Sequence, residues 1–170
     1  MCDYNPGMIV GILSDSHGRL KRVRQAIEVF RSNGVSAVFH CGDIGGVAIL
    51  QELAAFTKRF WFVWGNTDVP DNGLAGEVAQ LGLTWPDGPI VVELAGRRIA
   101  LAHGHEAKFL LLQHDPSLDY VFSGHTHGRS DSRRGHTRYI NPGALHRAAV
   151  HTVATLDLAT DDLHFHELPR

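Results

Sequence analysis

Five short segments of the sequence combine glycine with residue types that commonly bind metal ions. Their candidate ligands are Asp15 with His17, then Asp43, Asn66, His103, and finally His125 with His127. Carboxylate and amide oxygens mixed with imidazole nitrogens accept manganese, iron, zinc or nickel. No cysteine belongs to the set, which argues against a closed structural zinc site. Seven ligands exceed the needs of one tetrahedral ion, and they suit two ions that share a carboxylate.

A pair of adjacent divalent ions is a recurring device for hydrolysing phosphate esters. The ions lower the pKa of bound water and neutralise charge that develops on the phosphoryl oxygens. Two such ions bring more positive charge than two aspartates and a bridging hydroxide remove, so the vacant site would attract an anionic phosphate. The residue set therefore predicts a phosphoesterase whose nucleophile is a metal-bridging hydroxide.

Each of the five segments follows an apolar run of strand length, and these runs cover residues 8–13, 35–39, 59–64, 99–102 and 120–123. Apolar residues at helical spacing predict helices over 20–30 and 47–55. Alternating strands and helices indicate an α/β fold, in which loops beyond the carboxyl ends of the strands converge. Taken singly, Asp15 or Asp43 could instead cap the helix that follows. Five coincident strand ends favour metal binding.

The remaining pattern completes one domain. Helices are predicted over 74–81 and 106–113, and β-hairpins over 90–102, 130–140 and 150–168. No internal repeat, low-complexity tract or linker interrupts the chain. We therefore expect residues 1–7 to form an N-terminal lead-in and residues 8–170 to form a single domain.

The composition is ordinary for a globular protein of 170 residues, with 44% hydrophobic residues and a net charge of −2. No basic patch indicates binding to a nucleic-acid backbone. No apolar run approaches the ~20 residues that span a bilayer, and the N-terminus does not resemble a signal peptide. The two cysteines form no ligand pair. These features predict a cytoplasmic protein without a membrane partner.

The chain resembles the calcineurin-like metallophosphoesterases, and in particular their small prokaryotic phosphodiesterase branch. The resemblance rests on the segments LSDSHG, HCGDIG, GNTD, HGH and SGHTHGR and on Asn141-Pro142-Gly143, which together span about residues 9–143. It implies a four-layer α/β/β/α sandwich, in which helices flank two mixed β-sheets. It also implies two divalent metal ions, manganese first, with iron, zinc or nickel as alternatives.

The resemblance further implies how the ligands divide between two metals. One metal would be held by Asp15, His17, Asp43 and His127. The second would be held by Asp43, Asn66, His103 and His125, with Asp43 as the bridge. Asp43 and Asn66 are then the predicted catalytic residues, and Asn66 also lies near the phosphate.

Position 67 departs from the family pattern. Many members have a histidine there that is proposed to protonate the leaving group, whereas this chain has Thr67, whose hydroxyl is not an acid near neutral pH. Diesters with good leaving groups need no such proton, so we expect a phosphodiesterase. The alternatives are a phosphomonoesterase or nucleotidase of the same fold, and a non-catalytic interaction scaffold like the retromer subunit of this fold.

Several other residues carry weaker expectations. His105 could contact substrate or donate a proton, and Arg19 could reach a phosphate. His40 is expected to be packed beside the site. The edge of the 130–140 hairpin could pair with a second copy in a homo-oligomer. Solvated faces or hairpins are expected for the remaining histidines: His114, His136, His146, His151, His164 and His166.

Overall fold

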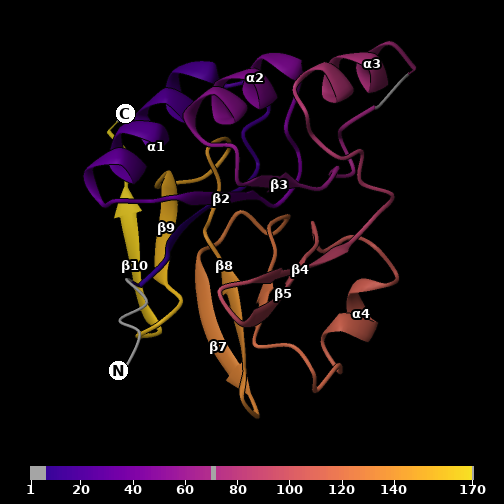
Figure 1. The fold of residues 1–170 in the computed structure, drawn as a ribbon. Coiled ribbons are helices and arrows are strands. Elements are labelled where there is room, and N and C mark those ends of the chain that lie inside the picture. Colours follow the sequence, from indigo (N-terminus) through magenta and orange to yellow (C-terminus); the bar gives the residue numbers. More distant parts are fainter. Residues whose placement is uncertain (1–6, 70–71, 170) are drawn as a thin grey trace, which may run out of the picture.

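Two β-sheets stacked face to face form the centre of the molecule, and helices lie outside them (Figure 1). The computed structural model describes residues 7–69 and 72–169. Each sheet has five strands and mixes parallel with antiparallel pairs. The predicted α/β sandwich with two mixed sheets is confirmed. Residues 1–6 and 170 lie outside the described residues, so the predicted boundary between lead-in and domain stays a prediction.

The first sheet has the strand order β10-β9-β1-β2-β3. Its strands are β1 (Ile9–Leu13), β2 (Ala37–His40), β3 (Phe60–Phe62), β9 (Thr152–Asp157) and β10 (Asp162–Glu167). The second sheet has the order β4-β5-β6-β8-β7. Its strands are β4 (Ile90–Leu94), β5 (Arg97–Leu101), β6 (Tyr120–Phe122), β7 (Ser130–Arg134) and β8 (Thr137–Asn141). The helices are α1 (Leu20–Ser32), α2 (Val47–Phe56), α3 (Asn72–Gln80) and α4 (Phe109–Leu112).

Strand β1 shows how the sequence pattern produces the layers. Its side chains alternate between the two faces of the sheet. Val10 and Ile12 lie in the core between the two sheets, whereas Leu13 belongs to the core beneath the helices. A strand that is apolar on both faces must be covered on both sides, which explains the apolar run in the sequence.

Helices α1, α2 and α3 cover the outer face of the first sheet (Figure 1). The buried face of α1 consists of Val23, Ala26, Ile27 and Phe30, at the spacing of an amphipathic helix. Burying a side chain as large as Phe30 contributes roughly 1.5–3 kcal/mol. Hydrophobic packing therefore fixes the helices on the sheet, and the loops between them and the strands are left at its edge.

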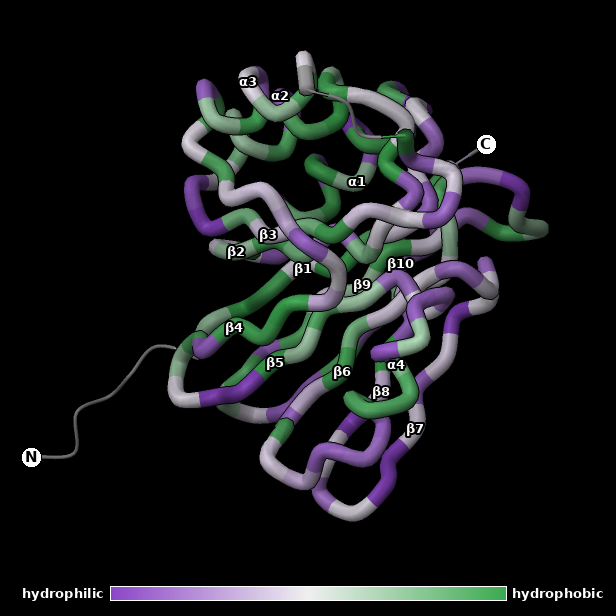
Figure 2. Tube along the Cα trace, turned by 90° about the vertical axis from the view of Figure 1, so that its right-hand side faces the viewer, coloured by the Kyte–Doolittle hydropathy of each residue, from purple (hydrophilic) through white to green (hydrophobic). Residues whose placement is uncertain are grey.

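The outer layer of the second sheet is thinner than predicted. Only Phe109–Leu112 form a helix, whereas the sequence predicts one over 106–113. The carboxylate of Glu106 accepts hydrogen bonds from the amides of His103 and Gly104, so the chain before α4 forms a loop instead. Strand β7 is exposed along its whole length, and Figure 2 shows it as hydrophilic while β4 is hydrophobic. The predicted pairing of this hairpin with a second copy stays a prediction.

No helix among the described residues is both long and apolar enough to span a membrane. Strands β1, β2 and β3 are mutually parallel, as are β5, β6 and β8. Each predicted ligand loop follows one of these parallel strands at its carboxyl end. The topology therefore directs all five loops to the same edge of the sandwich.

Candidate metal centre

The predicted ligand loops have unusual backbone conformations. Eight non-glycine residues of the described chain have positive φ angles, and five of these are predicted ligands. These five are Asp15 (53°), His17 (43°), Asp43 (53°), His125 (68°) and His127 (60°). Left-handed backbone is uncommon for such residues and gathers at functional sites, where the surrounding structure stabilises it. Neither aspartate caps a helix, because α1 begins after Arg19 and α2 after Gly46.

Two glycines allow the loops to approach closely. A Cβ atom on Gly65 would lie 2.1 Å from Oδ1 of Asp43 and 2.3 Å from its backbone nitrogen. A Cβ atom on Gly124 would lie 1.9 Å from Oγ of Ser14 and 2.7 Å from Oδ2 of Asp15. Only glycine fits at either position without displacing a neighbouring loop. The glycines noted in the sequence therefore set the distances between ligand loops.

One group of four predicted ligands lies within reach of a single ion. The ligand atoms of Asp15, His17, Asp43 and His127 all lie within 4.8 Å of one another. Nε2 of His127 lies 3.1 Å from Oδ1 of Asp15, and Nε2 of His17 lies 3.3 Å from Oδ2 of Asp43. Both aspartates are buried and both histidines are half-buried. These four side chains could hold one metal ion, with the buried aspartates below it and the half-buried histidines nearer the surface.

The other predicted ligands lie beside Asp43. Nε2 of the buried His103 is 3.5 Å from Oδ2 of Asp43 and 3.1 Å from Oδ1 of Asn66. The ring of His125 lies 5.0 Å from the ring of His103, measured between centroids. The backbone amide of His125 donates to Oδ2 of Asp15 at 3.2 Å, which connects the loop after β6 with the loop after β1. Asp43 thus lies between two groups of candidate metal ligands.

Two buried polar atoms at this place have no hydrogen-bond partner among the described residues. They are Oδ1 of Asp15 and Nε2 of His17. A buried polar atom without a partner costs about 1–3 kcal/mol, so such atoms need an explanation. A metal ion would give both atoms a partner. The donor set and these two atoms therefore fit a divalent cation.

Hydrogen bonds orient two of the imidazole rings. Nδ1 of His103 lies 2.7 Å from the carbonyl oxygen of Cys41, and Nδ1 of His127 lies 3.3 Å from that of Arg147. A carbonyl oxygen only accepts, so in each ring Nδ1 carries a proton. Rings of metal-binding histidines are commonly fixed in this way. In each ring Nε2 is therefore the nitrogen that would bind a cation.

Asp68 joins two of the ligand loops. Its carboxylate accepts from the backbone amides of Ile44 at 3.0 Å, Gly45 at 2.9 Å and Gly65 at 2.8 Å. The backbone amide of Thr67 donates to Oδ1 of Asp43 at 2.9 Å. The acidic residue of the GNTD segment thus holds the loop after β2 against the loop after β3. It is not itself a member of the ligand cluster.

The site favours an ionised aspartate at its centre. Burial opposes ionisation of Asp43, but hydrogen bonds from His103 and Thr67 outweigh it and hold its pKa well below the usual value. Burial also opposes protonation of His103, yet its hydrogen bonds with Asp43 and Cys41 raise its pKa. The carboxylate between the two groups of candidate ligands is therefore charged at neutral pH.

His40 is fully buried beside the site, as the sequence predicts. Its Nε2 lies 2.8 Å from Oγ of Ser16, and its Nδ1 accepts from the amide of Gly42 at 3.2 Å. Burial lowers the pKa of His40 to about 3. The neutral ring joins Ser16, in the loop after β1, to Gly42, in the loop after β2.

The two predicted substrate residues lie at the rim. His105 is exposed, and its ring centroid lies 5.3 Å from that of His103 and 6.2 Å from that of His125. Arg19 is also exposed, and its Nε donates to Nδ1 of His146 at 3.3 Å. Both side chains border the cluster without belonging to it.

Three residues near the site were not expected there. His146, expected on a solvated face, is half-buried, and its ring lies 5.1 Å from the ring of His17. The segment after β8 returns to the site, where the amide of Leu145 donates to the carbonyl oxygen of Ser14 at 3.2 Å. Oγ of Ser14 also donates to Oδ2 of Asp15 at 2.5 Å. The position of Ser14 directly before Asp15 could have indicated that it lies at the site. Nothing in the sequence around His146 indicates that it does.

Comparison with known proteins agrees with this geometry. Residues 8–161 match the model of the calcineurin-like phosphoesterase superfamily domain. Phosphodiesterase MJ0936 of Methanocaldococcus jannaschii is 30% identical over 162 residues, which cover 88% of this chain and 93% of that protein. A solved archaeal phosphodiesterase has a TM-score of 0.84 at 28% identity, with 95% of this chain and 100% of that one covered. The Escherichia coli phosphoesterase YfcE shares the fold, with a TM-score of 0.68 at 20% identity over 95% of this chain and 100% of that one.

Proposed function

Because this chain belongs to the calcineurin-like phosphoesterase superfamily, we propose that it hydrolyses phosphate diesters at a centre of two divalent metal ions. One observation carries the proposal. Oδ2 of Asp43 lies 3.3 Å from Nε2 of His17 on one side and 3.5 Å from Nε2 of His103 on the other. A carboxylate between two groups of imidazoles is the arrangement that a bridged metal pair requires.

The ligands divide between two ions. Asp15, His17, Asp43 and His127 hold the first, as their mutual distances allow. Asp43, Asn66, His103 and His125 hold the second, in which His103 and Asn66 approach to 3.1 Å. The mixed oxygen and nitrogen ligands favour manganese, with iron, zinc or nickel as alternatives. Ions bound there would activate water for attack on phosphorus and neutralise charge on the phosphoryl oxygens.

The protein itself supplies position and charge. Asn66 is exposed, so its amide can also donate a hydrogen bond to a phosphoryl oxygen of the substrate. The backbone amide of Thr67 donates a hydrogen bond to Asp43, which favours the ionised carboxylate. Asp68 keeps the two loops that carry Asp43 and Asn66 together.

The preference for diesters rests on Thr67 and on the archaeal relative. The hydroxyl of Thr67 lies 3.5 Å from Nδ1 of His17, and a hydroxyl is not an acid that could protonate a poor leaving group near neutral pH. The relative that is 30% identical is named a phosphodiesterase. An interaction scaffold without catalysis is less well supported, because every predicted ligand position here holds a competent side chain.

Hydrolysis of bis-(p-nitrophenyl) phosphate tests the proposal. Protein loaded with two equivalents of Mn²⁺, counted by elemental analysis, should release p-nitrophenolate. Asp43→Asn should abolish this release, whereas the same change at the exposed Asp87 should leave it intact. Absence of turnover with Mn, Ni, Co and Zn in protein with both sites filled would contradict the proposal. Faster hydrolysis of p-nitrophenyl phosphate than of the diester would instead identify a phosphomonoesterase.

A further inference from the structure

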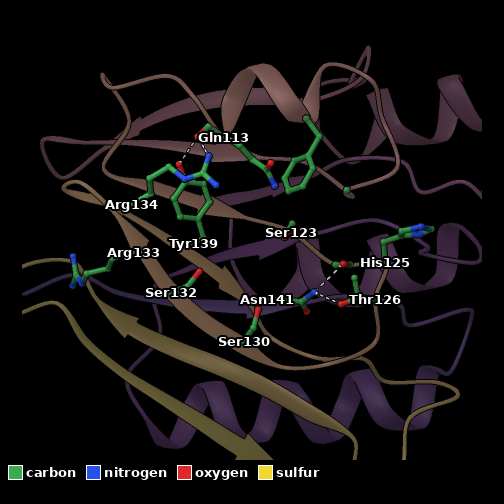
Figure 3. A pocket seen from close by; sticks show the side chains of 13 residues that line it. Gln113, Ser123, His125, Thr126, Ser130, Ser132, Arg133, Arg134, Tyr139 and Asn141 are labelled. Carbon is green, nitrogen blue, oxygen red and sulfur yellow. Dashed lines mark hydrogen bonds between the residues drawn. The ribbon is translucent and has the colours of Figure 1, made fainter.

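A cavity of about 330 Å³ opens over the second sheet beside the candidate metal centre. Its walls come from β7, β8, α4 and the loop after β6 (Figure 3). His125, a predicted metal ligand, lines one end. Ser123 and Asn141 lie between that end and the far end (Figure 3). The volume falls in the range of small-molecule sites, roughly 300–1,000 Å³.

Gly104 makes the cavity continuous with the metal-binding loops. It directly follows His103, and a Cβ atom placed on it would lie 3.6 Å from Cβ of His125 and 4.0 Å from a ring carbon of Phe109. His125 and Phe109 both line the cavity. A phosphorus atom bound at the metals would therefore have one of its ester groups directed along this wall.

Two half-buried aromatic rings line the cavity, those of Phe109 and Tyr139. Both pack against the small core cluster on the outer face of the second sheet. The hydroxyl of Tyr139 donates to the carbonyl oxygen of Gln113 at 2.8 Å, which fixes the ring. Fixed aromatic side chains flanked by hydroxyl and amide groups are suited to a flat heterocycle with polar edges.

The far end of the cavity carries an uncompensated positive charge. Nη1 of Arg134 donates to the carbonyl oxygen of Gln113 at 3.2 Å and lies 3.5 Å from Nδ1 of His114. Over residues 7–69 and 72–169, no carboxylate lies within ion-pairing distance of Arg134. Arg133, in contrast, is paired with Asp161, and Figure 3 shows its guanidinium pointing away from the other cavity residues.

We propose that this cavity binds one arm of a nucleotide-containing phosphodiester, with the base against Phe109 and Tyr139 and a second phosphate at Arg134. The inference rests on the proposed function, because it takes the scissile phosphate to be bound at the metals. A nucleotide arm combines the three features that the cavity matches: an aromatic base, hydroxyl groups and an additional negative charge. An Arg guanidinium forms paired, charge-assisted hydrogen bonds with a phosphate.

Two chromogenic diesters with the same scissile bond test the role of Arg134. They are the p-nitrophenyl ester of thymidine 5′-phosphate and its analogue with an added 3′-phosphate. In both, the oxygen of water replaces p-nitrophenolate on phosphorus. The Mn²⁺-loaded protein should show a KM about tenfold lower for the analogue. Arg134→Gln should remove this difference by raising the KM for the analogue. Arg133→Gln is the matched control and should keep the difference in KM between the two esters.

Binding measured without metal separates this inference from the proposed function. Thymidine 3′,5′-bisphosphate should bind the metal-free wild-type protein in calorimetry, and Arg134→Gln and Tyr139→Ala should each weaken it several-fold. Tyr139→Phe should retain the binding, because it keeps the ring. If both diesters are hydrolysed with equal KM, or if Arg133→Gln and Arg134→Gln act alike, the assignment of the cavity is wrong and the phosphodiesterase proposal stands. If the bisphosphate binds through Arg134 but no ester is hydrolysed, the cavity assignment stands and the proposed function is wrong.

Discussion

A single methyl group at Gly65 should disrupt the candidate metal centre. In Gly65→Ala the added Cβ would lie 2.1 Å from Oδ1 of Asp43 and 2.3 Å from its backbone nitrogen, whereas ordinary contact begins at 3.4 Å. The backbone nitrogen cannot rotate away as a flexible side chain could. The loops after β2 and β3 must therefore separate by roughly an ångström, which costs about 3 kcal/mol as overpacking in a closed region.

The same displacement moves Asp43 away from the position in which it can bridge two ions. We expect the affinity for Mn²⁺ to fall by about 10–100-fold, the effect typical of losing support around a metal ligand. Urea unfolding gives the change in stability, and calorimetric titration of the metal-free protein with Mn²⁺ gives the change in affinity. Both should change together in Gly65→Ala.

Gly76→Ala provides the matched control. Gly76 is exposed in α3, and no atom lies within 4 Å of a Cβ placed there. Alanine is more favourable than glycine in a helix by roughly 0.5–1 kcal/mol, so this variant should be slightly more stable than wild type. Its affinity for Mn²⁺ should be unchanged. Wild-type stability and wild-type Mn²⁺ affinity in Gly65→Ala would refute the close approach of the two loops.

Three further predictions follow from the contacts around the centre. Asp68→Ala removes three hydrogen bonds to loop amides, so unfolding in urea should show a loss of roughly 2–4 kcal/mol, and a loss below 0.5 kcal/mol would contradict the joining role. Burial lowers the pKa of His40 to about 3, while its unfolded value is ~6.5, so the unfolded chain binds the proton first as the pH falls. The contribution of neutral His40 to the free energy of unfolding should therefore be fully present above pH ~6.5 and be lost below it, by about 3 kcal/mol at pH ~4.5. In His40→Asn the free energy of unfolding should depend less steeply on pH. Excess Mn²⁺ should raise the melting temperature of chelator-treated protein, because a bound ion gives the unpartnered atoms of Asp15 and His17 a partner. The expected increase in the free energy of unfolding is about 2.7 kcal/mol at a Mn²⁺ concentration ~100 times Kd. An identical rise in Asp43→Asn would show that the ion binds elsewhere.

The candidate ligands that the structure brings together could be predicted because their chemistry is local. Asp15 and His17 are adjacent to the end of a strand, and so are Asp43, His103 and His125, each in its own loop. An apolar run followed by a glycine-containing polar loop is visible without knowledge of the fold. The rule that such loops meet at the carboxyl ends of parallel strands then brought residues far apart in sequence to one place.

The supporting contacts were partly predictable. His40 was expected to be packed beside the site, since it ends an apolar strand two residues before Gly42, and it is buried there. His146 was not expected at all, because nothing in the residues around it shows that the segment after β8 returns to the loop after β1. That return depends on long-range hydrogen bonds, from Leu145 to Ser14 and from Arg19 to His146, and on the packing of two sheets.

Only the tertiary structure decided the distances and the shape of the cavity. How closely the loop of Asn66 approaches Asp43 depends on Gly65, because a Cβ atom there would lie 2.1 Å from Oδ1 of Asp43. The cavity joins Phe109, Arg134 and His125, which belong to three different elements and share no sequence pattern. Sequence determines which side chains are available at each strand end, because that information is local. Their mutual geometry arises from packing between elements, which no single segment contains.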